Sequence, residues 1–311
     1  IAEIDLPQPN SDEVLVRVHA CALNRADLSM LTGAMHGKHG GNGAVLGLEW
    51  AGEVAAVGAS VTEFRPGDKV MCSGKGGFAE YALTDRGRVM PIPRSDMEYE
   101  QAACFPVALQ TMHDAIVTQG MLQPGQTVLI QGASTGVGLM GIQIAKHLGA
   151  GLVIGTSTTP AKRVQLAQFG LDAAVDSSVA SWLDQVLLLT GSQGADIVID
   201  QLAGRYANQN LRATKVGGRI VNVGRLAGTE DLFDFNLHAL RRISFIGVTF
   251  RTRSIEDVRE IKRRMMADLW PALAAGRLQQ PIDRCYDFDD VGTGFARMRQ
   301  NAHFGKIVLR L

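Results

Sequence analysis

The sequence lacks three features that would each indicate a class of protein. Its net charge is zero, with 31 basic and 31 acidic residues, so no overall field favours nucleic acid as a partner. No apolar run approaches the ~18 residues that span a bilayer, so we expect no membrane partner. The cysteines are few and have no paired spacing, which disfavours a disulfide framework and favours reduced thiols in the cytoplasm. They are Cys21, Cys72, Cys104 and Cys285.

The chain does contain enough apolar residues for a sizeable core. It has 311 residues, of which 46% are hydrophobic, and this length is typical of about two domains. Residues 1–106 alternate short apolar runs with turn residues and are expected to be rich in β-strands. Strands are predicted at 14–18, 52–57 and 69–71.

From residue 107 to 250 the pattern changes to apolar strands separated by helices, which predicts an α/β domain with a parallel sheet covered on both faces. Residues 251–311 are expected to return to the first domain. Strands are predicted at 127–131, 152–154, 196–200, 219–223, 244–250 and 306–311, and helices at 138–148, 163–169 and 255–269.

The strongest local motif is the run TVLIQGASTGVG at 127–138, which a helical pattern follows. A turn of small residues between a strand and a helix lets the backbone and the helix N-terminus approach a pyrophosphate. Ala133 and Thr135 occupy the first two glycine positions of the usual G-x-G-x-x-G fingerprint, and Gly138 occupies the third. The motif predicts a dinucleotide site; an ordinary strand-to-helix turn is the alternative.

The segment after the second strand indicates which nucleotide binds. Residues 154–163 contain no acid that would hold the ribose 2′-hydroxyl of NAD. Hydroxyls at 156–159 can donate to a 2′-phosphate, and Lys162 or Arg163 can neutralise it. We therefore expect NADPH, although Lys162 can also be a solvated lysine on a helix face.

Several segments together resemble the medium-chain dehydrogenase/reductase superfamily, in its zinc-free quinone oxidoreductase and ζ-crystallin branch. The resemblance covers essentially the whole chain. It implies a GroES-like, β-rich substrate domain plus a Rossmann, doubly wound parallel sheet, in a chain that lacks the N-terminal strands of the substrate domain. Besides the turn, the matching segments are ALNRADL (22–28), GLEWAGEV (47–54), VG (57–58), PGDKV (66–70), GGRIVNVG (217–224), GVTF (247–250) and GKIVL (305–309).

The resemblance also indicates whether the protein binds zinc. At the three places where zinc-using relatives carry catalytic ligands, this sequence has Asn24, Leu48 and Val107. These residues cannot supply the nitrogen and sulfur ligands that zinc requires. The lobe that holds a structural zinc is also absent, because the run MCSGKGGF continues straight through 71–78. His36 and His39 form a lone pair without a third ligand, so no metal is expected.

Position by position, the resemblance implies a set of contacts with the cofactor and the substrate. Asn24 is placed on the substrate side near the nicotinamide, with Asp27 close behind. The tyrosine that many relatives have near Met35 is missing, which puts an aromatic substrate clamp in doubt. The implied cofactor contacts are Ser134, Thr135, Gly136 and Val137 at the pyrophosphate; Thr158 and Lys162 at the 2′-phosphate; Val223, Gly224 and Arg225 beside the ribose; and Val248, Thr249 and Phe250 at the nicotinamide.

Without a Lewis acid, we expect hydride transfer to a quinone or an α,β-unsaturated carbonyl rather than alcohol oxidation. Asn24 would hydrogen-bond the developing oxyanion, or it satisfies local backbone groups. Asp27 is a catalytic candidate or, alternatively, a structural residue. Residues 244–250 predict an apolar edge strand, which a symmetric partner would cover in a homodimer.

Two other functions stay open. One is an enoyl-reductase module of a multi-enzyme synthase, which shares the motif around Asn24 and the glycine-rich turn; the end of the chain at Leu311 is expected to count against it. The other is a non-enzymatic NADPH-binding protein, of a crystallin-like or RNA-binding kind. Neutral charge disfavours RNA, and measurable NADPH turnover would set this function aside.

Overall fold

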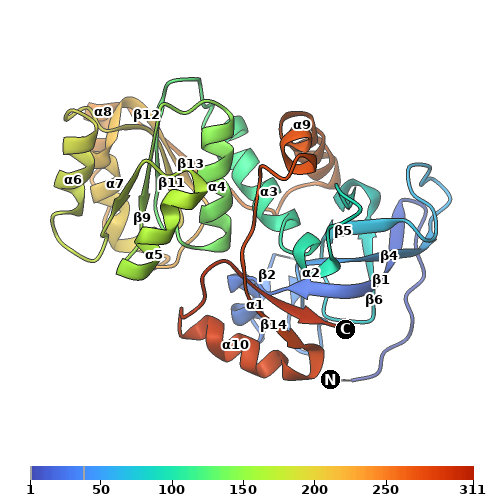
Figure 1. Ribbon diagram of the computed structural model, residues 1–311. Helices are drawn as coiled ribbons and strands as arrows, with labels where there is room; N and C mark the ends of the chain where they lie inside the picture. The colour runs from blue at the N-terminus through green and yellow to red at the C-terminus, as the bar shows by residue number, and fades with distance from the viewer. Residues whose placement is uncertain (1, 38) are drawn as a thin grey trace. The chain divides into compact units, whose positions relative to one another are not determined.

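The structure is a computed structural model that describes residues 2–37 and 39–311. It divides into two compact units. The first combines residues 1–110 with 250–311, so both ends of the chain belong to it, and the second comprises 111–249. In Figure 1 the blue and cyan segments share a unit with the orange and red ones. The sequence-based boundary at residue 107 lies in helix α3 (Pro106–His113).

A mixed sheet joins the two ends of the chain in the first unit. The C-terminal strand pairs antiparallel with the first strand, with Cys21 opposite Leu309, because both strands are apolar and completely buried there. In order across the sheet, the strands are β14 (Ile282–Asp287), β15 (Lys306–Arg310), β1 (Glu13–Ala22), β4 (Glu49–Val57), β5 (Lys69–Ser73) and β7 (Val89–Pro91), with β6 (Tyr81–Asp85) paired to β1.

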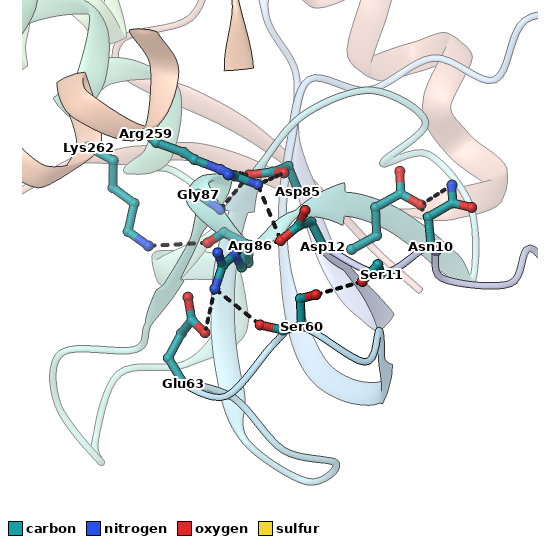
Figure 2. Close-up of polar contacts among 11 residues, drawn as sticks. Asn10, Ser11, Asp12, Ser60, Glu63, Asp85, Arg86, Gly87, Arg259 and Lys262 are labelled. Carbon is teal, nitrogen blue, oxygen red and sulfur yellow. Dashed lines mark hydrogen bonds and ion pairs between the residues drawn. The ribbon is translucent and has the colours of Figure 1, made fainter. Parts of the chain in front are cut away.

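An ion-pair network ties the C-terminal segment to this sheet, as Figure 2 shows. Arg259 lies on the long helix α9 (Ile255–Ala274), and its guanidinium donates to both carboxylate oxygens of Asp85, at 3.0 and 2.6 Å. Lys262 of the same helix donates to the carbonyl oxygen of Arg86 at 3.2 Å. The other short elements of the unit are α1 (Arg25–Met30), β2 (Met35–His36), β3 (His39–Gly40), η1 (Arg86–Arg88), α2 (Tyr99–Ala102), η5 (Phe288–Asp290) and α10 (Val291–Arg299).

The second unit is a parallel sheet between two layers of helices (Figure 1). Its strands have the order of a Rossmann fold: the first strand of the unit lies in the middle, the next two are added on one side of it, and the last three on the other. This confirms the expected fold class. In order, the strands are β10 (Ala173–Val175), β9 (Leu152–Thr156), β8 (Thr127–Ile130), β11 (Ala195–Asp200), β12 (Thr214–Asn222) and β13 (Ser244–Gly247).

Helices cover both faces of this sheet because its central strands are apolar on both sides. Helices from the first half of the unit cover one face and those from the second half the other. They are η2 (Asp114–Gln119), α4 (Gly136–His147), α5 (Pro160–Gln165), η3 (Leu166–Phe169), α6 (Trp182–Leu189), η4 (Gly204–Tyr206), α7 (Ala207–Ala213) and α8 (Phe235–Arg241).

The structure differs from the sequence-based elements at a few places. The helix expected at 163–169 begins earlier, at Pro160, whose fixed φ suits the first helical turn, and it changes to a 3-10 helix at Leu166. Strands β10 and β14 and helices α6 and α10 lie in segments for which no element was predicted. In the described part of the chain, no helix is long and apolar enough to cross a lipid bilayer.

Candidate functional site: a nucleotide edge and a buried polar cluster

The turn between β8 and α4 has the geometry of a phosphate-binding loop. Thr135 is the N-cap of α4, and its hydroxyl accepts a hydrogen bond from the backbone N–H of Gly138 at 2.9 Å. A Cβ at Gly138 would lie 2.6 Å from the carbonyl oxygen of Gly132, so only glycine fits. Gly132 itself has a φ of 71°, in the left-handed region. The turn therefore brings a bare backbone and the start of a helix to one place, which suits an anion.

Buried polar side chains that the sequence analysis did not single out hold this turn in place. The amide of Gln201 donates to the carbonyl oxygens of Gln131 and Gly132, at 3.0 and 3.2 Å. Its oxygen accepts from the hydroxyl of Thr135 at 2.9 Å. Gln201 directly follows β11, and the turn directly follows β8. Because β11 and β8 are parallel neighbours in the sheet, their carboxyl ends bring Gln201 and the turn together. No local pattern in the sequence signals this contact.

The expected hydroxyl donors near the 2′-phosphate divide into two groups. Thr156 is completely buried, and its hydroxyl donates to the side-chain oxygen of Gln131 at 2.7 Å. Ser157 is also buried and shares a 3.0 Å hydrogen bond with Ser134. Thr158 and Thr159 are exposed. Of the four hydroxyls, therefore, only the last two face solvent.

The remaining candidate cofactor residues of this unit follow the carboxyl ends of β12 and β13. The backbone N–H groups of Val223 and Gly224 donate to the carbonyl oxygen of Asp200, at 2.8 and 3.2 Å. A Cβ at Gly224 would lie 2.7 Å from the carbonyl oxygen of Gln201. All strands of this sheet are parallel, so their carboxyl ends share one edge. The candidate residues of this unit all gather at that edge: Ser134, Thr135, Gly136, Val137, Thr158, Lys162, Val223, Gly224, Arg225, Val248 and Thr249.

Phe250 belongs to the first unit, where the guanidinium of Arg253 lies 5.9 Å from the centre of its ring. The edge of the second unit fits a nicotinamide dinucleotide, because the turn has no room for a Cβ at Gly138 and brings the N-terminus of α4 to the carboxyl ends of the strands.

The first unit contains a buried polar cluster of Asn24, Asp27, Glu49 and Lys306. The Lys306 ammonium is ion-paired with Glu49 and donates to the side-chain oxygen of Asn24 at 3.0 Å. The Asn24 amide in turn donates to Glu49 at 3.0 Å. Glu49 also accepts the backbone N–H of Val107 at 2.9 Å. The cluster thus connects β4, β15, α1 and the start of α3. Neither Glu49 nor Lys306 was a candidate site residue in the sequence analysis.

The side-chain amide of Asn24 is fully engaged within the protein. One hydrogen bond goes to Glu49, and a longer one, at 3.3 Å, goes to the carbonyl oxygen of Ala22. An amide has two hydrogens to donate. To hydrogen-bond an oxyanion, Asn24 must therefore release a partner, and Ala22 is the weaker of the two.

Asp27 is completely buried beside Asn24. Its Oδ2 accepts the backbone N–H of Asn24 at 2.7 Å, which caps α1. The backbone N–H of Gly47 also approaches this carboxylate and favours its charged form, although Oδ1 makes no hydrogen bond of good geometry among the described residues. Burial raises the pKa of the Asp27 carboxyl from 3.8 to about 7, against the opposing effects of the Asn24 N–H and the Lys306 charge. This carboxyl can therefore hold a proton near neutral pH.

The residues at the places of the zinc ligands do not fit the metal. Leu48 and Val107 have hydrocarbon side chains, the Asn24 amide is engaged, and the Glu49 carboxylate is paired with Lys306. Residues 2–37 and 39–311 hold no group of three or more His, Cys, Asp or Glu side chains suited to a metal ion. The side chain of His36, which was considered with His39, lies outside the described residues.

The comparisons with known proteins agree with this architecture. The family profile "Alcohol dehydrogenase GroES-like domain" matches residues 10–94, and "Zinc-binding dehydrogenase" matches 136–267. Quinone oxidoreductase-like protein 2 of Bos taurus is 30% identical, over 98% of this chain and 87% of the relative. A solved quinone oxidoreductase of Pseudomonas syringae has the same fold, with a TM-score of 0.89 and 24% identity over 100% of this chain and 94% of that one.

Large synthases are also similar in sequence to this chain. A phenolphthiocerol/phthiocerol polyketide synthase of Mycobacterium tuberculosis is 30% identical over 100% of this chain, which spans only 14% of the synthase. The quinone oxidoreductase-like relative, in contrast, matches this chain over 87% of its own length. The chain therefore belongs to the medium-chain dehydrogenase/reductase superfamily of oxidoreductases and, within it, to the quinone oxidoreductase-like branch.

Proposed function

We propose that this chain is a reductase that uses NADPH to transfer hydride to a quinone or an α,β-unsaturated carbonyl, without a metal. The observation that carries the proposal is the phosphate-binding turn, where Gly138 has no room for a Cβ and Thr135 caps the helix. At the same edge, Thr158 is exposed and Lys162 lies in α5, four residues further along the chain; a hydroxyl and a cation in this segment support a 2′-phosphate. The names of the quinone oxidoreductase relatives support the substrate class.

The residues of the chain would act mainly by binding and orientation. When bound, NADPH supplies the hydride. The turn at 132–138 would hold the pyrophosphate, and Val248 and Thr249 would lie beside the nicotinamide. Asn24 would donate to the oxyanion that develops on the substrate after releasing Ala22, while Lys306 holds its side-chain oxygen. Asp27 is the member of this cluster that can hold a proton near neutral pH.

A second candidate is enoyl reduction within a multi-enzyme synthase. The similarity to a polyketide synthase over the whole of this chain favours it. The two functions share the hydride chemistry and differ in the acceptor, which is a 2-enoyl thioester in the second. We also propose that the protein is located in the cytoplasm and has no membrane or nucleic-acid partner, in line with its balanced charge.

The decisive experiment is a screen of NADPH oxidation with quinones, short enones and 2-enoyl thioesters as acceptors. We expect turnover with a quinone or an enone, and zinc below about 0.1 per chain by elemental analysis. A strong preference for thioesters would favour the synthase function. Stoichiometric zinc, lost together with activity on chelation, would contradict the metal-free mechanism.

A glycine pair on α4 provides variants for the same assay. Gly138→Val should abolish NADPH binding, because its side chain would collide with the backbone of the turn. Gly141→Ala is the control on the same helix, because its Cβ would meet the flexible side chain of Met112 at 3.1 Å. Equal NADPH affinity in Gly138→Val and the wild type, with both variants folded by circular dichroism, would contradict the placement of the cofactor at this turn.

A further inference from the structure

An arginine–aspartate pair lies at the end of the second strand of the nucleotide sheet. The guanidinium of Arg163, on α5, contacts the carboxylate of Asp176 at 2.9 Å and donates to the carbonyl oxygen of Ser157 at 2.8 Å. The other carboxylate oxygen of Asp176 accepts from the backbone N–H and the hydroxyl of Ser178, at 2.9 and 2.6 Å. Both oxygens are therefore held, and the position of the carboxylate is well defined.

Parallel pairing of the strands brings Asp176 to the cofactor edge. Val175 of β10 lies opposite Thr156 of β9, so the residues that follow them, Asp176 and Ser157, emerge side by side. The end of the second strand is where an acid selects the 2′-hydroxyl of NAD, or an arginine accommodates the 2′-phosphate of NADP. Both an acid, Asp176, and an arginine, Arg163, are present here, and they form an ion pair with each other.

We propose that Asp176 determines the cofactor preference of this protein by holding Arg163 away from the 2′-phosphate. The inference rests on the proposed function, in which a nicotinamide dinucleotide binds at this edge. Asp176 neutralises the guanidinium and adds a negative charge that repels a 2′-phosphate. The same carboxylate can accept a hydrogen bond from a ribose 2′-hydroxyl. The wild-type protein therefore binds both NADPH and NADH, with a smaller preference for NADPH than its basic residues alone would give.

The test is calorimetric titration of the cofactor-free protein with NADPH and with NADH. Asp176→Asn removes the charge and keeps an oxygen that can accept from Ser178. Because partly exposed ion pairs contribute little, we expect the ratio of the NADH to the NADPH dissociation constant to rise by about three- to fivefold. Asp172→Asn is the matched control, since Asp172 precedes the same strand at its opposite end and is paired with Lys146 at 3.0 Å. It should leave the ratio unchanged.

A second variant separates release of the arginine from a general effect of charge. In an Arg163→Gln background there is no guanidinium to release and only the effect of the Asp176 charge itself remains, so Asp176→Asn should raise the ratio by less than it does in the wild-type background. An unchanged ratio in Asp176→Asn alone, with both cofactors still bound, would overturn the inference and leave the proposed function intact. Failure of the wild-type protein to bind either cofactor would overturn the proposed function, and this inference with it.

Discussion

The ammonium group of Lys306 is ion-paired with the carboxylate of Glu49 inside the first unit, where both side chains are almost completely removed from solvent. Lys306 lies on the last strand and Glu49 at the start of β4. Two opposite charges buried together compensate each other, whereas a single remaining charge would be left in a medium that solvates it poorly. The stability of the last strand, β15, and that of β4 therefore depend on each other through this pair.

Lys306→Met should lower the free energy of unfolding by about 3–5 kcal/mol, because it leaves Glu49 buried and unpaired. Adding Glu49→Gln should restore part of the loss, since the glutamine is neutral. Urea unfolding followed by circular dichroism measures both. Lys215→Met is the control, because the pair of Lys215 with Asp196 is partly exposed, and its loss should cost less than about 1 kcal/mol. Similar losses for Lys306→Met and Lys215→Met would contradict the interpretation.

The carboxyl of Asp27 should make stability depend on pH. Its pKa is about 7 in the folded protein, above its ordinary value of 3.8, so the folded state binds the proton more tightly. This contribution is complete below the unfolded pKa and is lost as the pH rises through the folded pKa. Between about pH 5 and pH 8, wild type should lose on the order of 2 kcal/mol relative to Asp27→Asn. If the urea midpoints of the two proteins change by the same amount with pH across this range, Asp27 does not titrate in this way.

The side chain of Lys162 tests the choice of NADPH. A charge-assisted contact with the 2′-phosphate is worth about 1.5–3 kcal/mol, so Lys162→Ala should weaken NADPH about ten- to hundredfold and leave NADH nearly unchanged. Dissociation constants from fluorescence titration measure the effect. Equal losses for both cofactors would mean that the lysine matters for folding or for general binding. No loss for either would mean that another residue contacts the 2′-phosphate.

The edge strand β13 leads us to expect a twofold dimer. It lies at the end of the parallel sheet, with the Phe245 side chain 41% exposed. The neighbouring helix α8 exposes Phe235 and Leu240 by 75% and 74%. An uncovered apolar edge favours a second copy as its partner. Sedimentation at micromolar concentration should show a dimer, which Phe235→Arg weakens. Val164→Arg, an equally exposed site on α5, should have no effect. A wild-type protein that sediments only as a monomer would refute the expectation.

The close approach of α9 to η1 can be tested at Gly87 (Figure 2). A Cβ there would lie 2.2 Å from the Cγ atom of Arg259, so Gly87→Ala should cost about 1–3 kcal/mol of stability by overpacking. In an Arg259→Ala background this collision is absent. The cost of Gly87→Ala should then fall below about 1 kcal/mol, as a double-mutant cycle of thermal or urea unfolding would measure. Additive losses in the double variant would contradict the contact.

Features that depend on neighbouring residues could be predicted from the sequence. The alternation of strands and helices in the second unit and the turn before Gly138 follow from local apolar spacing and small residues. Features that depend on distant pairing were missed. Asp176 reaches the end of the second strand only because β10 pairs with β9. Gln201 supports the phosphate-binding turn from another strand, and no pattern near either residue indicates this role.

The alternation of strands and helices follows from the order of residues alone, because apolar periodicity and glycine-rich turns are local properties of the chain. The family was indicated by the resemblance of its ordered motifs to those of known proteins. That Leu48 and Val107 cannot coordinate zinc also follows from their chemistry, wherever they lie. The contacts of Asn24, in contrast, depend on how the chain folds in three dimensions. Lys306 lies 282 positions away in the sequence and reaches the side chain of Asn24 because β15 pairs with β1. Burial, which raises the pKa of Asp27, likewise depends on every segment packed around it.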